Sequence, residues 1–175
     1  EGPVSVAPVD LDLDGDVDLV AGTRAGLGWL QNTDGQGTMG ALVGIGAADI
    51  FVHAADLDAD GDPDIVSSVD LNGGIRWYAN AGAGTFGAPQ TISAALSASD
   101  IRSSDLDGDG DPDLVFALEN GDVAWSANTD GAGSFGALQT IATAQAAEDM
   151  QCADLDGDGL QDLLWSNRAM GPVHF

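Results

Sequence analysis

The sequence predicts an all-β fold made of β-propeller blades, each a sheet of four antiparallel strands. An aspartate-rich stretch occurs four times, starting at Asp10, Asp56, Asp105 and Asp154, and a tryptophan-containing stretch follows each of the first three copies. Apolar residues show no sustained helical period, and the 25 glycines are too many for long helices. Repeats of roughly 40–50 residues that each hold four short strands are typical of propeller blades.

The first two strands of each unit flank the aspartates. The first is a mostly apolar or small-residue stretch, expected at residues 4–9, 50–55, 100–104 and 149–153. The second is the apolar run that follows the aspartates, such as residues 113–118. We therefore expect the aspartates to lie in the loop between these two strands.

The third and fourth strands carry aromatic residues. Turns such as "ENGD" and "LNGG" lead into the strand with Trp29, Trp77 or Trp125, and "NTDG" or "NAGAG" leads into the strand with Phe86 or Phe135. Asn, Asp and Gly supply the positive φ that tight hairpins need. The tryptophans could stack on sugar rings, but we favour packing between neighbouring blades, and we expect the phenylalanines in the core.

The whole chain, residues 1–175, is expected to form a single β-propeller segment, since this length suffices for one domain with a core. The repeats are expected at approximately 1–46, 47–95 and 96–144, with a partial fourth at 145–175. The fourth unit stops before its phenylalanine–glycine strand. We therefore expect an excerpt of a longer chain, or a piece whose open edges are covered by another copy or a partner.

The charge balance restricts the partners. The formal net charge is −25, there is no lysine, and the basic residues are Arg24, Arg76, Arg102 and Arg168. Such a surface repels phosphate backbones and anionic lipid, so we expect no nucleic-acid partner. No apolar run approaches the ~20 residues of a membrane span, so no membrane insertion is expected. A metal or another cationic partner is the natural inference.

The repeated aspartates have the spacing of metal ligands. Counted from the first aspartate, positions 1, 3, 5 and 9 are Asp in all four copies, and position 6 is Gly15, Gly61, Gly110 or Gly159. The predicted side-chain ligands are Asp10, Asp12, Asp14, Asp18, Asp56, Asp58, Asp60, Asp64, Asp105, Asp107, Asp109, Asp113, Asp154, Asp156, Asp158 and Asp162. Position 7 is expected to contribute its backbone carbonyl, from Asp16, Asp62, Asp111 and Leu160.

Oxygen-only ligands suit a hard cation with six or more ligands, which favours Ca²⁺, one ion per loop and about four in all. Glycine at position 6 permits the sharp turn. Calcium loops of helix–loop–helix proteins begin alike but close with a glutamate at position 12, where this chain has Ala21, Ser67, Phe116 and Trp165. We expect the position 9 aspartate to close the loop. The alternative, a solvated acidic turn, is less favoured because four copies keep the same register.

With these motifs, the sequence resembles the FG-GAP/VCBS repeat family, the calcium-binding β-propeller repeats also found in integrin α-subunit heads. The resemblance rests on the aspartate loops, on "FGAP" at 86–89, "FGAL" at 135–138 and the weaker "MGAL" at 39–42, and it covers essentially the whole chain. It implies one calcium between the first two strands of each blade. Because propellers of this family usually have seven blades, three full repeats and a partial fourth would belong to a larger ring, or be completed by a partner or by self-association.

The leading functional hypothesis is a calcium-stabilised, non-catalytic module for adhesion, assembly or recognition of a protein or glycan partner. It would act outside the cell, secreted, at the cell surface or in the periplasm, because cytosolic calcium would leave such sites nearly empty. The alternatives are a carbohydrate-binding accessory module of a secreted enzyme and a structural repeat in a larger extracellular assembly. No nucleophile elbow, phosphate loop or His-rich motif appears, and the carboxylates repeat identically, so no enzyme is expected.

Other polar residues are expected to have structural roles. His53 and His174 stand apart from any Ser or Cys pattern. Asp34 and Asp130, in "NTDG", are interpreted as turn residues. Cys152, the only cysteine, is expected at a small, buried position as a passive thiol that forms no internal disulfide. The arginines fall at different places in the repeats, so no shared role is expected for them.

Overall fold

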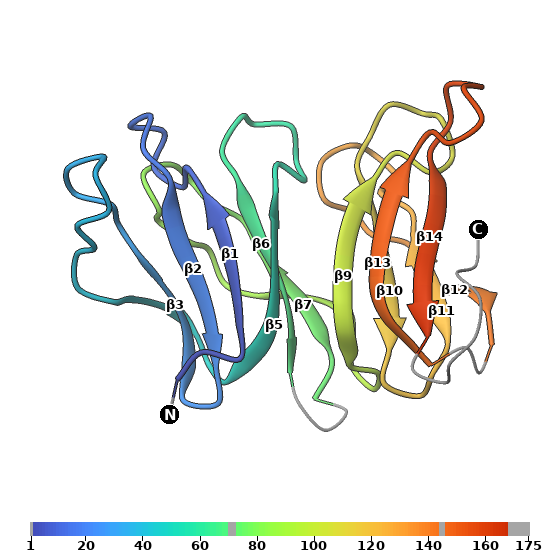
Figure 1. The fold of residues 1–175 in the computed structure, drawn as a ribbon, viewed down its shortest axis with the longest axis horizontal. Coiled ribbons are helices and arrows are strands. Elements are labelled where there is room, and N and C mark those ends of the chain that lie inside the picture. Colours follow the sequence, from blue (N-terminus) through green and yellow to red (C-terminus); the bar gives the residue numbers. More distant parts are fainter. Residues whose placement is uncertain (1, 70–72, 144–145, 168–175) are drawn as a thin grey trace.

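The computed structural model describes residues 2–69, 73–143 and 146–167, and within them it contains fourteen strands, four antiparallel sheets and no helix (Figure 1). We call the sheets blades 1 to 4. Blade 1 contains β1 (Ser5–Val9), β2 (Asp18–Thr23), β3 (Gly26–Leu30) and β4 (Val43–Gly46). Blade 2 contains β5 (Asp49–Ala55), β6 (Asp64–Val69), β7 (Ile75–Tyr78) and β8 (Gln90–Ser93).

Blade 3 contains β9 (Ala98–Ser104), β10 (Asp113–Leu118), β11 (Val123–Ser126) and β12 (Gln139–Ala142). The described part of blade 4 consists of β13 (Ala147–Ala153) and β14 (Asp162–Asn167). Strands pair in chain order within each blade, every pair antiparallel. Each blade is thus a simple meander, as the turn signals of the sequence predicted.

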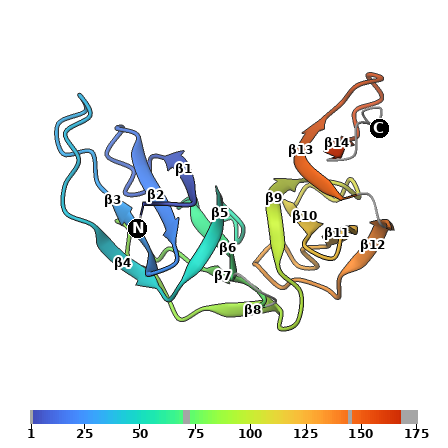
Figure 2. The same ribbon diagram turned by 60° about the horizontal axis from the view of Figure 1, so that its bottom comes forward.

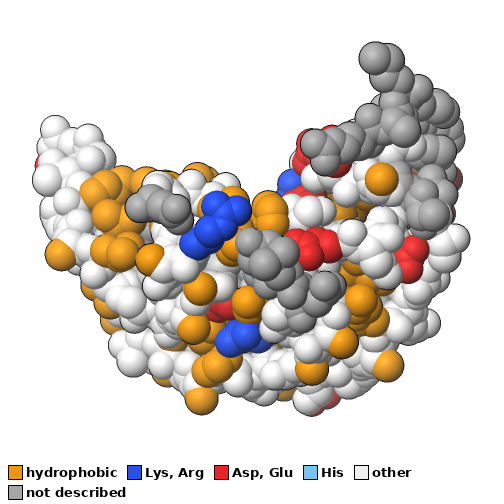
Figure 3. All heavy atoms as spheres, turned by 90° about the horizontal axis from the view of Figure 1, so that it is seen from below, with side chains coloured by type: hydrophobic (Ala, Val, Ile, Leu, Met, Phe, Trp, Pro, Cys, Tyr) orange, Lys and Arg blue, Asp and Glu red, His pale blue; other side chains and the backbone are white. Residues whose placement is uncertain are grey.

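The blades fan out around an axis along which their first strands lie (Figure 2). In this arrangement β1 contacts β5, β5 contacts β9 and β9 contacts β13. The sheets formed by the described residues do not close into a ring, and from below the molecule has the outline of an open arc (Figure 3). The predicted fold class, an open segment of a β-propeller, is therefore confirmed.

The core lies between the blades. Trp29 and Tyr78 share a buried cluster between blades 1 and 2, and Trp77 and Phe116 share one between blades 2 and 3. Trp125 is half-buried against a third cluster, between blades 3 and 4. Phe86 and Phe135 are half-buried at the edges of these clusters, and the Phe135 ring meets Trp77 edge-on with centroids 6.1 Å apart. The predicted packing of the aromatic residues between blades is confirmed.

The first strands of blades 2, 3 and 4 begin one or two residues earlier than predicted. In blades 2 and 4 the pairing register shifts near the start of the strand, between Asp49 and Phe51 and between Ala147 and Asp149. In blade 3 the shift is equivalent: Ala117 pairs with Asp100 and Leu118 with Ala98, so Ser99 is the extra residue on β9. Such a bulge interrupts the two-residue alternation of side chains on which a strand is recognised in sequence. The predicted strand at 113–118 matches β10.

Candidate metal centre

Four aspartate-rich loops project from the same end of the blades (Figure 1). We call them loops 1 to 4: residues 10–18 between β1 and β2, 56–64 between β5 and β6, 105–113 between β9 and β10, and 154–162 between β13 and β14. At position 6, φ is +95° in Gly15, +93° in Gly61, +97° in Gly110 and +92° in Gly159. Glycine at this position therefore makes the turn that the sequence predicted.

Position 4 also has a positive φ in every loop, a feature that was not predicted from the sequence. The angle is 58° at Leu13 and Ala59, 80° at Gly108 and 79° at Gly157. Left-handed backbone is unfavourable for residues with a Cβ. The signal available in the sequence was that glycine stands at this position in two of the four copies.

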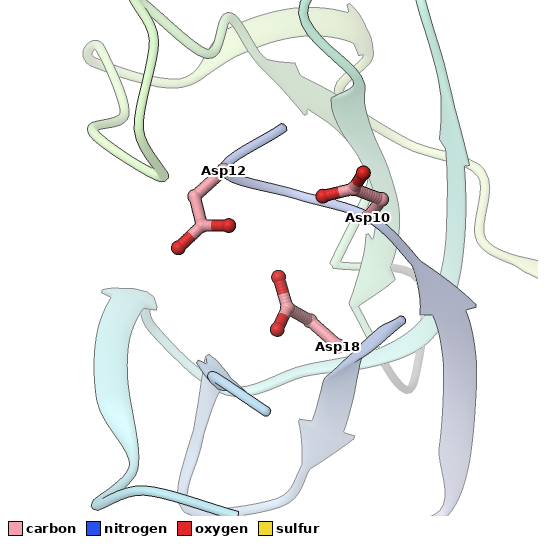
Figure 4. A group of neighbouring side chains, drawn as sticks. All are labelled: Asp10, Asp12 and Asp18. Atoms are coloured by element: carbon pink, nitrogen blue, oxygen red, sulfur yellow. The ribbon is translucent and has the colours of Figure 1, made fainter. Parts of the chain in front are cut away.

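In each loop the carboxylates of positions 1, 3 and 9 converge. One oxygen from each lies within 4.8 Å of the other two, in the groups Asp10–Asp12–Asp18, Asp56–Asp58–Asp64, Asp105–Asp107–Asp113 and Asp154–Asp156–Asp162. Figure 4 shows the three side chains of loop 1 pointing toward a common centre. The two strand ends and the loop thus present a set of oxygens to one point.

The position 9 aspartate holds the loop closed through the backbone. Asp18 is fully buried, its Oδ2 accepts a hydrogen bond from Leu11 N at 3.0 Å, and its Oδ1 accepts one from Asn32 N at 2.7 Å. Asp64 and Asp113 are also fully buried and make the equivalent bonds. This aspartate therefore fixes both the loop and the chain after the tryptophan strand.

Positions 5 and 7 lie outside the converging groups. The position 5 carboxylate accepts a hydrogen bond from the position 7 N–H in all four loops, at 2.8 to 3.0 Å. The Asp16 and Asp111 side chains lie against Gly35 and Gly131 in the next hairpin turn. Of the predicted ligands, the structure therefore brings together the side chains of positions 1, 3 and 9.

The position 1 carboxylate accepts a hydrogen bond from the N–H of the position 6 glycine in every loop, at 3.0 to 3.1 Å. In loops 3 and 4 the position 4 glycine N–H satisfies the other oxygen at 2.7 Å. In loops 1 and 2 that oxygen, Oδ1 of Asp10 and of Asp56, is buried without a hydrogen-bond partner, as is Asp58 Oδ1. A buried carboxylate oxygen without a partner is costly, and a bound cation would satisfy it.

Burial and crowding also raise the pKa of four of these aspartates. Burial, reinforced by neighbouring carboxylates, raises the pKa of Asp12 and Asp58. Burial raises the pKa of Asp113 and brings that of Asp64 to about 6. Several carboxylates held together in partly dry surroundings favour a neutralising charge. The donor set, the convergence and the unsatisfied oxygens fit a hard, oxygen-coordinated cation.

Away from the loops, His53 makes a contact that its sequence surroundings did not indicate. Its Nε2, on β5, is hydrogen-bonded to Ser103 Oγ, on β9, at 2.8 Å, which is in keeping with the structural role expected for this histidine. Burial, with a smaller effect of the Arg102 charge, lowers the His53 pKa to about 4. A histidine that resists protonation in this way ties blade 2 to blade 3. His174 lies outside the described residues.

Asp34 and Asp130 are turn residues, as predicted. Asp34 Oδ1 accepts hydrogen bonds from Gln36 N at 2.9 Å and Thr38 N at 3.1 Å, and Asp130 repeats the pattern. Hydrogen bonds, that of the Thr38 side chain foremost, lower the Asp34 pKa. Cys152 is half-buried rather than buried, and partial burial raises its thiol pKa, which keeps it weakly nucleophilic.

Comparison with known families identifies the repeat. The sequence model of the FG-GAP-like repeat matches three times, at residues 10–67, 56–116 and 105–165. No curated protein sequence matches the chain significantly. In the described residues, no helix is long and apolar enough to cross a membrane.

Several solved structures share the fold. A lectin from Agrocybe aegerita that recognises non-reducing terminal N-acetylglucosamine is 22% identical, with a TM-score of 0.62 over 95% of this chain and 50% of the lectin chain. BBS1N, solved in complex with ARL6DN, is 12% identical, with a TM-score of 0.63 over 95% and 51%. The Vibrio cholerae biofilm matrix protein Bap1 is 21% identical, with a TM-score of 0.55 over 94% and 24%. The chain thus spans about half the length of the first two.

Proposed function

The chain belongs to the FG-GAP-like repeat family, and from this we propose that it is a calcium-stabilised, non-catalytic extracellular binding module. The observation that carries the proposal is the convergence of the position 1, 3 and 9 carboxylates in four successive loops. Identical groups in every blade suit a repeated structural role better than a unique catalytic site. Oxygen ligands alone favour calcium over softer metals.

The proposed ligands are the side chains of positions 1, 3, 5 and 9, together with the position 7 carbonyl. When bound, calcium would supply the positive charge that joins the two strand ends of each blade. Extracellular modules bind calcium with a dissociation constant of ~10⁻⁴–10⁻³ M. At millimolar calcium and a constant of ~0.1 mM, mass action contributes roughly 1.5 kcal/mol of stability per site. Four sites would then contribute about 6 kcal/mol, comparable to the whole stability of many domains.

Thermal unfolding with calcium and with excess chelator tests the proposal. We expect chelation to lower the melting temperature by many degrees, and we expect Asp12→Asn to reduce the calcium-dependent part of the shift. Asp34→Asn is the matched control, because it removes one charge from a turn outside the loops. Identical melting curves with calcium and with chelator would contradict the structural role of calcium.

The extracellular location and the binding role are part of the same proposal. Sites of this affinity are filled only where calcium is abundant. The similar solved structures include a lectin and a biofilm matrix protein, which supports a protein or glycan partner. We also propose that the four blades belong to a larger ring of about seven, because the arc is open and the chain spans about half of two of the similar chains.

A carbohydrate-binding role is the second candidate, favoured by one observation. Trp29 and Trp77 are 5% and 3% exposed and therefore unavailable for sugar stacking. The half-buried Trp165 instead lines a shallow pocket of about 200 Å³ with Asp149, Gln151, Leu164 and Ser166. An aromatic ring beside carboxylate, amide and hydroxyl groups is suited to a sugar. A glycan array that detects no binding by the wild-type chain, or equal binding by Trp165→Ala, would rule this site out.

A further inference from the structure

Asn80, which follows β7, joins blade 2 to loop 1. Its side-chain Nδ2 donates to Leu11 O at 3.0 Å and to Pro63 O at 3.1 Å. Leu11 is position 2 of loop 1, and Pro63 is position 8 of loop 2. One amide group therefore binds the aspartate loops of two neighbouring blades.

The same residue also contacts a carboxylate of the second loop. Asn80 N donates to Asp64 Oδ1 at 2.8 Å, and Asp64 belongs to the converging group of loop 2. On the other side, Leu11 N donates to Asp18 Oδ2 at 3.0 Å, and Asp18 belongs to the group of loop 1. A continuous path of hydrogen bonds therefore runs from Asp18 through Leu11 and Asn80 to Asp64.

Asn128, which follows β11, extends this path to the third loop. Its Nδ2 donates to Leu57 O at 2.8 Å, and its backbone N donates to Asp113 Oδ1 at 2.9 Å. Leu57 N donates to Asp64 Oδ2 at 2.9 Å. Asp64 thus has one oxygen on the path to loop 1 and the other on the path to loop 3. Loop 2 is the centre of the chain of contacts.

The path is shielded from water. The residues that form it are all fully buried: Leu11, Asp18, Leu57, Asp64, Asn80, Asp113 and Asn128. Hydrogen bonds in such surroundings are stronger than at the surface, and a partner left without its bond is costly. A change in the position of one loop is therefore poorly tolerated by the next.

We propose that Asn80 and Asn128 couple the cation sites of loops 1, 2 and 3, so that these sites fill cooperatively. The inference rests on the proposed calcium binding. A cation in loop 1 would fix Asp10 and Asp12 and, between them in the chain, the Leu11 carbonyl that Asn80 binds. Asn80 is then already placed against Asp64, so less conformational freedom is lost when loop 2 fills. Electrostatic repulsion between the bound cations opposes this cooperativity.

Asn32 provides a matched control. Its N donates to Asp18 Oδ1 at 2.7 Å and its Oδ1 accepts from Gly37 N at 3.1 Å, as Asn80 Oδ1 accepts from Gly82 N at 3.1 Å. Within residues 2–69, 73–143 and 146–167, its amide donates to no carbonyl of another blade. Asn32→Ala therefore removes only the side-chain bond to Gly37, whereas Asn80→Ala removes the matching bond to Gly82 and also the amide bonds to Leu11 and Pro63 that link the blades. The backbone N–H of residue 32 or 80 still donates to the position 9 aspartate in both variants.

Calcium titrations followed by NMR test the coupling site by site. The position 6 glycines, whose N–H groups bind the position 1 carboxylates, report each loop separately. Asp58→Asn, which disables loop 2, should raise the calcium midpoints of loops 1 and 3 by about fivefold or more, the lower range of coupling between sites. With Asn80→Ala present, loop 1 should no longer respond to Asp58→Asn, while loop 3 still does. With Asn32→Ala present, both loops should respond.

The outcomes separate the two hypotheses. Glycine resonances that ignore calcium in the wild-type chain would refute both calcium binding and its coupling. If the wild-type chain binds calcium but Asp58→Asn leaves the calcium midpoints of loops 1 and 3 unchanged, or lowers them, the coupling is overturned. The structural role of calcium would then remain intact. If Asn80→Ala does not fold, Asp58→Asn in the chain with native asparagines decides by itself, and Asn128→Ala repeats the cycle between loops 2 and 3.

Discussion

At the scale of single residues, position 4 of the aspartate loops accepts a side chain where the backbone favours glycine. Leu13 has φ +58° and is 54% exposed, so its side chain gains little from burial. In loops 3 and 4 the glycine at this position also donates its N–H to the position 1 carboxylate. Loop 1 therefore carries backbone strain and an unsatisfied Asp10 oxygen together.

Leu13→Gly should relieve this strain. We expect the chain in chelator to be stabilised by about 1–2 kcal/mol, from the left-handed backbone and the regained hydrogen bond. Leu155→Gly is the control, since Leu155 is 53% exposed and has no positive φ. It should destabilise by about 0.5–1 kcal/mol through the entropy of the unfolded chain. Chemical denaturation measures both, and a destabilising Leu13→Gly would refute the argument.

His53 gives the protein an acid-sensitive contact between blades 2 and 3. Its pKa of about 4 lies below the ordinary value of 6.5, so between these pH values the unfolded chain binds a proton that the folded chain refuses. The contribution to stability is complete above pH 6.5 and is lost progressively as the pH falls toward 4. His53→Gln does not titrate. As the pH falls from 7 to 4.5, the melting temperature of this variant should therefore approach or exceed that of the wild-type chain. A difference between the two melting temperatures that stays constant with pH would refute the pKa argument.

At the scale of elements, the hairpin between β11 and β12 fits closely onto blade 2. Gly133, with φ +80°, lies directly against the Trp77 ring, and Gly84 lies in the same way against Trp29. A Cβ at either position would collide with the indole. The glycine of each hairpin therefore sets how closely a blade approaches its predecessor.

Gly133→Ala should test this close approach. We expect a loss of roughly 2–4 kcal/mol, from about 1–2 for the positive φ and about 1–3 for the overpacked ring. Gly37→Ala is matched, because Gly37 has φ +91° and open space around it, so only the backbone cost of about 1–2 kcal/mol should appear. Urea denaturation of the two variants measures the difference. Equal losses would show that the Trp77 contact is not restrictive.

The sequence allowed the elements to be predicted because the same spacing occurs four times. The loops, the turns at Gly15 and Gly61 and the strand at 113–118 all follow from local patterns of one or two repeats. The contacts between blades do not, since Asn80 and Leu11 are 69 residues apart and no local rule pairs them. The available signal was an asparagine at the end of each tryptophan stretch, at positions 32, 80 and 128. The pairing of His53 with Ser103 likewise needed the positions of two blades.

At the scale of the whole molecule, charge is concentrated at one end. The four aspartate loops lie together at the top of Figure 1, whereas few acidic side chains are visible on the opposite end in Figure 3. With a net charge of −25, repulsion among the loops opposes folding when no cation is bound.

Salt should therefore partly replace calcium. In chelator, raising sodium chloride from about 0.02 to about 0.5 M shortens the Debye length from roughly 20 to roughly 4 Å and should raise the melting temperature. With millimolar calcium present, the same change should have a much smaller effect, since the bound ions already neutralise the loops. A salt effect of equal size in both conditions would show that the loops are not its source.

Because the main packing contacts join each blade to the next one along the chain, the molecule is a linear array of units rather than one indivisible core. In such an array stability is a sum of unit and neighbour terms, and opening starts at the outermost units. Blade 3, flanked on both sides, has a wholly buried β10, whereas β14 of blade 4 is only partly buried. Backbone amides should therefore exchange with deuterated solvent slowest in β6 and β10 and fastest in β14. Calcium would slow the exchange without changing this order.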